Sequence, residues 1–321
     1  MLLTVRNLAT FFFLDEGVLR AVDDVSFTIG ERETVALVGE SGCGKTIVAL
    51  SLINLVPPPG RVVGGQVLLN DEDLLRIDAE RLRQIRGSEI GFVFQEPGAA
   101  LNPVLTIGSQ ISEVLREHKA LSKHEAESEA VRLLGEVGIP NPEQRARAYA
   151  FELSGGMRQR AVIAIAMSTR PKLLVADEPT TALDVTVQAE ILDLLRHLQA
   201  QYGLAMLLIT HDLGVVAEMA SRVMVMYSGK LVETAPTDAL FESPQHPYTK
   251  GLVASIQRLG GGREDALQGI PGSVPDFLNL PAGCTFHPRC SIGDASCIAE
   301  FPPLRRVAIG RQCACYKVQP A

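Results

Sequence analysis

Several features that would indicate other classes of protein are missing or scarce in this chain of 321 residues. It has no tryptophan, and no hydrophobic run approaches the roughly 20 residues that a membrane-spanning helix needs. Its formal net charge of −7 argues against the basic surface of nucleic-acid-binding proteins. The start, Met1–Arg6, lacks the basic and apolar segments of a secretory signal peptide. We therefore expect a soluble, intracellular protein that does not bind nucleic acid.

Cysteine is scarce over most of the chain and concentrated at its end. Only Cys43 lies outside the C-terminal 38 residues, which contain Cys284, Cys290, Cys297, Cys313 and Cys315. Past about residue 243 the chain is also rich in Pro and Gly and shows no long periodic element. We therefore predict a main domain over residues 1–242 and a separate C-terminal extension over residues 243–321.

One motif dominates the first half of the chain. It matches G-x-x-x-x-G-K-[ST], the phosphate-binding P-loop, and consists of Gly39, Glu40, Ser41, Gly42, Cys43, Gly44, Lys45 and Thr46. A buried strand is predicted before it at Thr34–Val38 and a buried helix after it at Ile47–Ile53. This context argues against a mere glycine-rich surface turn. Backbone N–H groups and the helix N-terminus would bind phosphate, with Lys45 on the β- and γ-phosphates and Thr46 on Mg²⁺.

Predicted strands and helices alternate along the rest of the main domain. The first 35 residues alternate apolar and polar positions, which is typical of an antiparallel β region. Further strands are predicted at residues 64–70, 90–95, 172–178 and 204–210, and helices at 107–138, 157–167 and 188–201. The pattern predicts an α/β fold with a mostly parallel sheet core that helices cover on both faces.

An acidic pair, Asp177 and Glu178, closes an apolar strand. Alone, such a pair would be read as a solvated strand edge. Downstream of a P-loop, it indicates catalysis, because ligand groups gather at strand ends in open α/β sheets. Asp177 suits a Mg²⁺ partner, and Glu178 suits the general base that takes a proton from the attacking water.

The segment Leu153–Gly156 precedes a strongly predicted helix. Ser154, Gly155 and Gly156 could form a second anion site at the helix N-terminus, or a plain helix cap. Leu-Ser-Gly-Gly is the signature of ABC-type ATPases. The order P-loop, Gln95, signature, acidic pair and His211 resembles that family over the whole chain.

The resemblance implies a P-loop ABC cassette with an antiparallel β subdomain and a helical signature subdomain at about residues 101–165. The signature, Ser154, Gly155, Gly156 and Gln159, would complete in trans the ATP site of a second subunit. Gln95 would contact Mg²⁺ and signal to a membrane partner, Asp184 would belong to the D-loop, and His211 would hold the γ-phosphate and the attacking water. Phe12 would stack on adenine, with Phe11 and Phe13 as alternatives.

Finer motifs resemble the ATPase subunits of dipeptide/oligopeptide importers. They are Met157–Arg160, Asp177–Thr186, Pro244–Thr249 and Gly283–Cys290. The resemblance implies ATP hydrolysis that drives peptide import at the cytoplasmic face of the plasma membrane. Expected partners are a second, different ATPase subunit, two permease subunits and an extracytoplasmic peptide-binding protein. An importer of nickel or another small solute is the alternative. A soluble ABC ATPase of DNA maintenance is disfavoured, because no sustained heptads separate P-loop and signature.

The same resemblance implies a [4Fe–4S] cluster on Cys284, Cys290, Cys297 and Cys315, with Cys313 as an extra cysteine. Zinc would use the same four thiolates, although their spacing is unlike that of zinc ribbons. Disulfides are disfavoured in a reducing compartment. Because the P-loop is far away in sequence, the cluster is expected to be a structural staple for a segment with little core.

Overall fold

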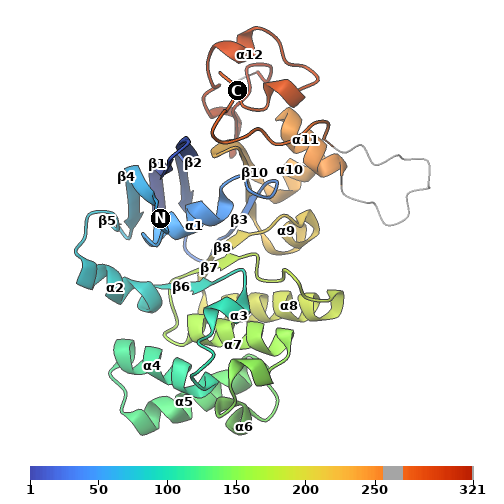
Figure 1. The fold of residues 1–321 in the computed structure, drawn as a ribbon. Coiled ribbons are helices and arrows are strands. Elements are labelled where there is room, and N and C mark those ends of the chain that lie inside the picture. The colour runs from blue at the N-terminus through green and yellow to red at the C-terminus, as the bar shows by residue number, and fades with distance from the viewer. Residues whose placement is uncertain (256–269, 320–321) are drawn as a thin grey trace. The chain divides into compact units, whose positions relative to one another are not determined.

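The structure is a computed structural model that describes residues 1–255 and 270–319. It contains two compact units, and each interrupts the other in sequence (Figure 1). The P-loop unit consists of Leu3–Thr28, Thr34–Leu75 and Thr210–Ala321. The helical unit consists of Met1–Leu2, Ile29–Glu33 and Arg76–Ile209. The predicted extension over residues 243–321 includes residues 256–269 and 320–321, which lie outside the described residues.

The first 75 residues form the antiparallel β region that the alternating pattern predicts. Its four-stranded sheet has the order β2-β1-β4-β5. The strands are β1 (Leu3–Leu14), β2 (Gly17–Ile29), β4 (Gly60–Leu69) and β5 (Glu72–Asp73). β1 pairs with β4 from Leu3 opposite Leu69 to Phe12 opposite Gly60, with bulges around Ala9. Alternate side chains of β1 are buried, such as Leu3 and Val5, as expected for a sheet with one covered face.

The P-loop strand, β3 (Thr34–Val38), is buried along its whole length. It runs parallel to β9 (Arg222–Tyr227), which pairs with the antiparallel β10 (Lys230–Pro236). Helix α1 (Lys45–Leu52) follows the P-loop, and α9 (Leu213–Met219) precedes β9. The predicted strand at Thr34–Val38 is therefore confirmed. The helix begins two residues before the predicted Ile47, because Lys45 and Thr46 already belong to its first turn.

The C-terminal residues extend this sheet. β12 (Arg311–Cys313) pairs with β10, and β11 (Arg305–Ala308) pairs with β12. Within the described residues, the helical elements that accompany them are short, as expected past residue 243. They are α10 (Thr237–Glu242), α11 (Pro247–Ala254), the 3₁₀ turn η2 (His287–Arg289) and α12 (Ser296–Ala299). Tyr227, Tyr248 and Phe286 share one buried cluster, so the extension packs on the sheet through apolar contacts.

The helical unit has its own parallel strands. β7 (Leu173–Asp177) pairs with β6 (Ile90–Val93) on one side and with β8 (Ala205–Ile209) on the other. Every residue of β7 and β8 is buried, which fits the continuous apolar runs in the sequence. Helices α7 (Gly155–Met167) and α8 (Val185–Tyr202) belong to the same unit.

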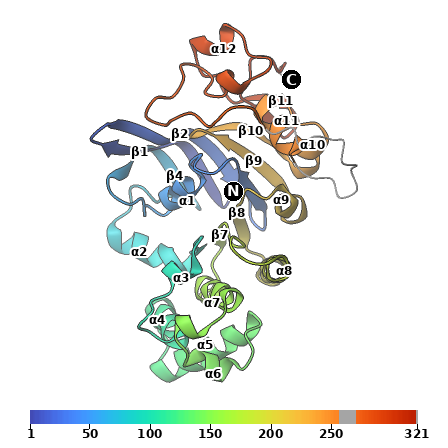
Figure 2. The same ribbon diagram turned by 45° about the vertical axis from the view of Figure 1, so that its right-hand side comes forward.

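Five further helices and a 3₁₀ turn complete this unit. They are α2 (Ala79–Ser88), α3 (Pro97–Ala100), α4 (Ile107–Lys119), α5 (Lys123–Glu136) and α6 (Pro142–Ala146), with η1 at Ala150–Glu152. Figure 2 shows α4 to α7 grouped together. The region predicted as helical over 107–138 is two helices. Ala120 adopts a left-handed backbone (φ 52°) and Ser122 starts α5 with a capping box.

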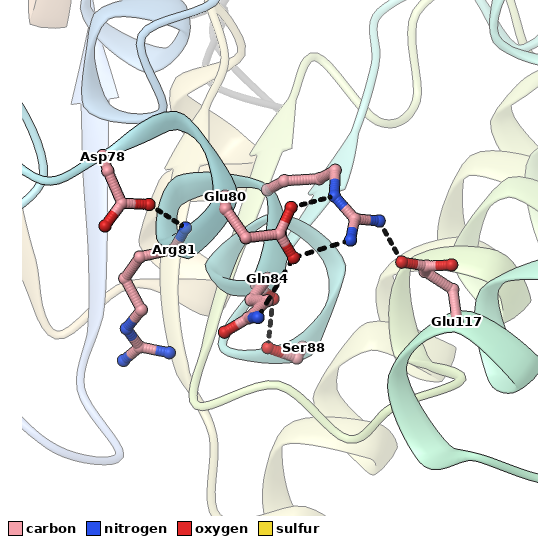
Figure 3. Close-up of polar contacts among 7 residues, drawn as sticks. Asp78, Glu80, Arg81, Gln84, Ser88 and Glu117 are labelled. Carbon is pink, nitrogen blue, oxygen red and sulfur yellow. Dashed lines mark hydrogen bonds and ion pairs between the residues drawn. The ribbon is translucent and has the colours of Figure 1, made fainter.

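Polar contacts fix the start of α2 and join it to α4 (Figure 3). The Asp78 carboxylate caps α2 by accepting from the Arg81 amide at 2.8 Å. Arg83 donates to both Glu80 oxygens, at 3.0 and 2.8 Å, and to Glu117 on α4. These groups are exposed, so each pair contributes little to stability and mainly orients the two helices.

The sequence predicted no membrane-spanning helix, and the described helices can be compared with that expectation. None within residues 1–255 and 270–319 combines the length and the apolar character required to cross a bilayer.

Candidate functional site

The P-loop is held by close backbone contacts that leave no room for side chains at two of its glycines. A Cβ atom at Gly44 would lie 2.2 Å from the Ala21 carbonyl oxygen, and Gly44 has φ 108°. A Cβ atom at Gly39 would lie 2.3 Å from the Met226 carbonyl oxygen. Both positions therefore require glycine. Gly42 (φ 78°) faces open space, which leaves the outer side of the loop accessible.

Lys45 lies inside this loop. Its side chain is buried, and Nζ donates to the carbonyl oxygens of Gly39 at 2.9 Å and Glu40 at 3.1 Å. An ammonium group exchanges such carbonyl partners for phosphate oxygens without leaving the loop. Thr46, in the first turn of α1, is half-buried beside it. Burial raises the pKa of the neighbouring Cys43 thiol, so this cysteine stays protonated at neutral pH.

The C-terminal extension reaches the second residue of the P-loop. Arg289 Nη1 and Nη2 bind the two Glu40 carboxylate oxygens at 2.7 and 3.0 Å. The Glu40 amide donates to Tyr248 Oη at 2.8 Å. The Glu40 carboxylate raises the pKa of Arg289, and burial raises that of Tyr248. At neutral pH Arg289 is therefore charged and the Tyr248 hydroxyl is neutral. The extension thus contacts the P-loop although the two segments are far apart in the sequence.

His211 also belongs to the P-loop unit. It follows Thr210, whose amide donates to the Leu37 carbonyl of β3 at 3.3 Å. β3 ends at Val38 and the P-loop begins at Gly39, so this bond brings His211 to the edge of the sheet that bears the loop. The His211 side chain is exposed there. Asp212, the next residue, caps α9 by accepting from the Gly214 amide at 2.8 Å.

The acidic pair lies in the helical unit with Gln95. Asp177 is the last residue of β7 and is 2% exposed. Glu178 Oε2 accepts from Gln95 Nε2 at 3.1 Å and from Thr181 Oγ1 at 2.8 Å. The structure thus joins two residues that the sequence predicted for the same site. A carboxylate held by two donors has a fixed orientation, which suits a base that acts on one water.

The signature segment starts helix α7. Ser154 caps it, with Oγ accepting from the Met157 amide at 3.3 Å. The helix includes Gly155 and Gly156, whereas the sequence predicted its start at Met157. A Cβ atom at Gly156 would lie 2.7 Å from a Val187 methyl group, so glycine permits close packing against α8. Ser154 and Gly155 are exposed, but Gln159 is buried at 2% exposure, away from any surface that a partner could contact in this conformation.

Asp184, the predicted D-loop residue, precedes α8 directly. Its carboxylate accepts from the Val187 amide at 3.0 Å and caps the helix. Val187 is also the residue that packs on Gly156. The D-loop and the signature therefore meet at the start of α8, within the helical unit.

The three adjacent phenylalanines of β1 have different surroundings. The Phe11 ring lies under the Arg20 guanidinium at 5.5 Å, and the Phe13 ring under that of Arg61 at 4.3 Å. The Phe12 ring packs against Gly60, where an added Cβ would lie 2.6 Å from it. Phe12 therefore points to the opposite face of the strand from its neighbours. Its assignment to adenine stays a prediction.

Four of the five C-terminal cysteines line one small cavity. They are Cys284, Cys290, Cys297 and Cys315, and Phe286 and His287 also line the cavity. Burial raises the pKa of Cys284 to about 11. Cys313 lies instead in β12, fully buried, opposite Glu233 of β10. Over residues 1–255 and 270–319, however, no three His, Cys, Asp or Glu side chains come close enough to hold a metal ion.

Sequence reasoning missed Thr181, Tyr248 and Arg289. Thr181 lies three residues after Glu178, inside a motif already singled out, and could have been found there. Tyr248 and Arg289 lie in motifs quoted only for their resemblance to peptide importers. No local pattern links a residue to a partner 249 positions away in the chain. That contact emerges only from the fold.

Comparisons with known proteins identify the family of the chain. Residues 22–181 match the family ABC transporter, and residues 232–297 match the family Oligopeptide/dipeptide transporter, C-terminal region. The oligopeptide transport ATP-binding protein AppD of Bacillus subtilis is 51% identical over 316 residues, which is 98% of this chain and 96% of AppD. A Brucella melitensis protein named for peptide import is 50% identical over 317 residues, 95% of this chain and 94% of its own length.

Solved structures confirm the predicted fold class. The dimeric ATP-binding cassette MJ0796, bound to ADP and phosphate, is 27% identical with a TM-score of 0.66, and the match covers 73% of this chain and 98% of that one. CbiO1 of Clostridium perfringens, part of an ABC transporter complex, is 25% identical with a TM-score of 0.63, covering 75% and 91%. The chain belongs to the ATP-binding subunits of ABC transporters, in the oligopeptide/dipeptide transporter family.

Proposed function

We propose that this chain is the ATP-hydrolysing subunit that powers import of dipeptides or oligopeptides through a membrane permease. One observation carries the proposal: a complete P-loop and the oligopeptide/dipeptide transporter C-terminal region lie in one chain that aligns with AppD over 98% of its length. The domain boundary at residue 242 and the helical subdomain at about 101–165 belong to the same proposal.

The chemistry assigns a role to each residue of the site. Lys45 and the P-loop amides would bind the β- and γ-phosphates of ATP, and Thr46, Gln95 and Asp177 would supply oxygen ligands to Mg²⁺. Glu178 accepts the proton of the attacking water, and His211 orients the γ-phosphate. ATP binding favours the closed dimer and hydrolysis reopens it, which couples the reaction to the permease.

The expected partners follow from the same proposal. They are a second, different ATPase subunit, two permease subunits and an extracytoplasmic peptide-binding protein, with this chain on the cytoplasmic face of the plasma membrane. Purification of the native complex followed by ATP-dependent uptake into vesicles would test it. Uptake of labelled peptide, but not of Ni²⁺, is expected. Uptake of Ni²⁺ but not of peptide would contradict the proposal that the transporter imports peptides, and it would leave the assignment of this chain as an ATPase unchanged.

Ser154→Arg is expected to block the ATP-dependent dimer while this chain still binds ATP. Ser154 is exposed, and a bulky cation there would occupy the position of the partner's nucleotide. The substitution also removes a helix cap, which costs about 1 kcal/mol of stability. Ser122→Arg is the matched control, because Ser122 is also an exposed helix cap, at the start of α5, where it forms a capping box with Glu125.

Light scattering with Mg-ATP measures both variants together with the second ATPase subunit. Equal dimer formation by Ser154→Arg and by Ser122→Arg would contradict a signature that acts in trans. A stable ATP-bound homodimer of the parent chain would instead contradict the expected heterodimer.

The cysteine cavity is proposed to hold a [4Fe–4S] cluster on Cys284, Cys290, Cys297 and Cys315. Their shared cavity supports the choice of these four over Cys313, and binding would require the thiols to move closer together than they lie in the described structure. Four thiolates suit iron–sulfur clusters and also zinc, which remains the alternative. Because each ligand must lose its proton, loading would be coupled to deprotonation of buried thiols such as Cys284.

Cys290→Ser is expected to abolish the brown colour and the bound iron of anaerobically purified protein, while ATP still binds. Cys313→Ser is the matched control and should keep both, because its thiol lies outside the cavity. Absorption spectra and iron and sulfide content measure the difference. If the parent protein is colourless and contains one zinc per chain, the cavity binds zinc and not an iron–sulfur cluster. Loss of colour only in Cys313→Ser would show that Cys313 is a ligand of the cluster, in place of one of the four proposed cysteines.

A further inference from the structure

The carbonyl, the amide and the carboxylate of Glu40 all form polar contacts. Its carbonyl accepts from Lys45 Nζ at 3.1 Å, its amide donates to Tyr248 Oη at 2.8 Å, and its carboxylate binds Arg289 through two nitrogens at 2.7 and 3.0 Å. The first contact is internal to the P-loop. The other two come from the C-terminal extension. The backbone and the charge of the second P-loop residue are therefore set from outside the loop.

The surroundings of Arg289 hold its guanidinium in place for the ion pair with Glu40. Its side chain is 5% exposed. Besides Glu40, its guanidinium donates to the carbonyl oxygens of Pro271 at 2.8 Å and Ile270 at 3.4 Å, and to Tyr227 Oη at 3.3 Å. These bonds use all five guanidinium donors, which fixes the plane of the group. A paired guanidinium and carboxylate in this two-pronged geometry form a strong and directional ion pair.

The residues that hold Glu40 are themselves fixed. Arg289 ends the 3₁₀ turn His287–Arg289, and its amide donates to the Phe286 carbonyl at 3.0 Å. The Phe286 ring packs at 5.2 Å from Tyr227 and at 5.4 Å from Tyr248. Tyr248 is fully buried. The two contacts to Glu40 thus originate from one rigid aromatic cluster.

The charge of Glu40 makes this arrangement matter for nucleotide binding. ATP brings several negative charges into the loop that contains Glu40, and the Glu40 carboxylate would repel them if it were unpaired. Arg289 neutralises that carboxylate, and Tyr248 holds the amide beside it. We propose that Arg289 and Tyr248 are positioning residues of the ATP site, through which the C-terminal extension holds the P-loop in its phosphate-binding form. The proposal goes beyond peptide import and depends only on ATP binding by this chain.

Arg289→Met tests the ion pair. The change keeps much of the apolar volume and leaves Glu40 unpaired, so we expect the Kd for Mg-ATP to rise by about tenfold. Glu40→Gln removes the charge and should change the Kd by less than about twofold, since no carboxylate is left to repel phosphate. The double variant should bind like Glu40→Gln alone. This rescue is the decisive result, because a merely unfolded extension would not be repaired by a change in the P-loop.

Arg305→Met is the matched control. Arg305 also stabilises the extension, by donating to the carbonyl oxygens of Cys315 at 3.1 Å and Val318 at 2.7 Å. Within the described residues its guanidinium makes no hydrogen bond or ion pair with the P-loop. Isothermal titration of the full chain with Mg-ATP measures all variants. Parent-like binding by Arg289→Met would overturn the proposal. So would a double variant as weak as Arg289→Met, or an equal loss in Arg305→Met.

Tyr248→Phe tests the second contact independently. It removes one oxygen from a buried site and leaves the Glu40 amide without its acceptor. We expect the Kd for Mg-ATP to rise by about fivefold, because an amide that loses its acceptor in a partly buried site is costly. In the assembled transporter, the same variant should raise KM for ATP more than it lowers kcat, since it disturbs binding rather than the hydrolytic residues. A fall in kcat at unchanged KM would contradict a positioning role at the P-loop.

Discussion

Lys45→Ala is expected to abolish tight binding of ATP, with a rise in Kd of at least about 100-fold, since two charge-assisted hydrogen bonds to phosphate are lost. Lys45 is the only cation in the P-loop motif, and its ammonium already lies inside the loop at 2.9 Å from the Gly39 carbonyl oxygen. The remaining amides and the helix N-terminus cannot offset the phosphate charge at the same positions. Titration of the full chain with Mg-ATP measures the effect.

Lys250→Ala is the control for Lys45→Ala. Lys250 is an exposed lysine on α11 of the same unit, so its loss changes the net charge equally but leaves the loop intact. It should bind ATP like the parent. Urea unfolding of both variants shows whether weaker ATP binding reflects the loss of the Lys45 contacts to phosphate or the loss of the fold. Parent-like ATP binding by a folded Lys45→Ala variant would refute the P-loop assignment.

Local sequence patterns predicted much of this molecule. The P-loop could be recognised because its chemistry needs particular residues at fixed spacing within eight positions, beside a strand and a helix. The continuous apolar runs at β7 and β8 identified buried parallel strands, since both faces of such strands are covered. Glu178 was assigned to the site from its place at a strand end and Gln95 from the family resemblance, and the structure adds the contact between them.

Features that depend on tertiary contacts were not predictable. The split of the helical region 107–138 at Ala120 is an exception: no proline or glycine marks it, but Ser122 and Glu125 form a capping box that is a local signal of a helix start. The tail looked independent because composition shows where a module starts but not what it packs against. Its strands β11 and β12 extend the sheet at β10, and Arg289 pairs with Glu40 across 249 residues. Both depend on how distant segments fold together.

Glu178→Gln is expected to bind ATP and to lose most of its turnover, by about 10²- to 10⁴-fold, as is typical when general-base assistance is removed. The amide keeps the size of the side chain and one oxygen to accept from Gln95 and Thr181, which now contact the carboxylate at 3.1 and 2.8 Å. It cannot take a proton from water. Hydrolysis should therefore stop at a stage at which ATP is bound and the dimer is closed.

Single-turnover hydrolysis by the assembled transporter measures the loss, and light scattering with ATP measures the accumulated dimer. Glu143→Gln, an exposed carboxylate in α6 of the same unit, is the matched control and should hydrolyse ATP like the parent. Unchanged turnover in Glu178→Gln would exclude Glu178 as the base. His211 is then the first alternative, because its exposed imidazole lies at the edge of the sheet that bears the P-loop, and His211→Ala should show the loss instead.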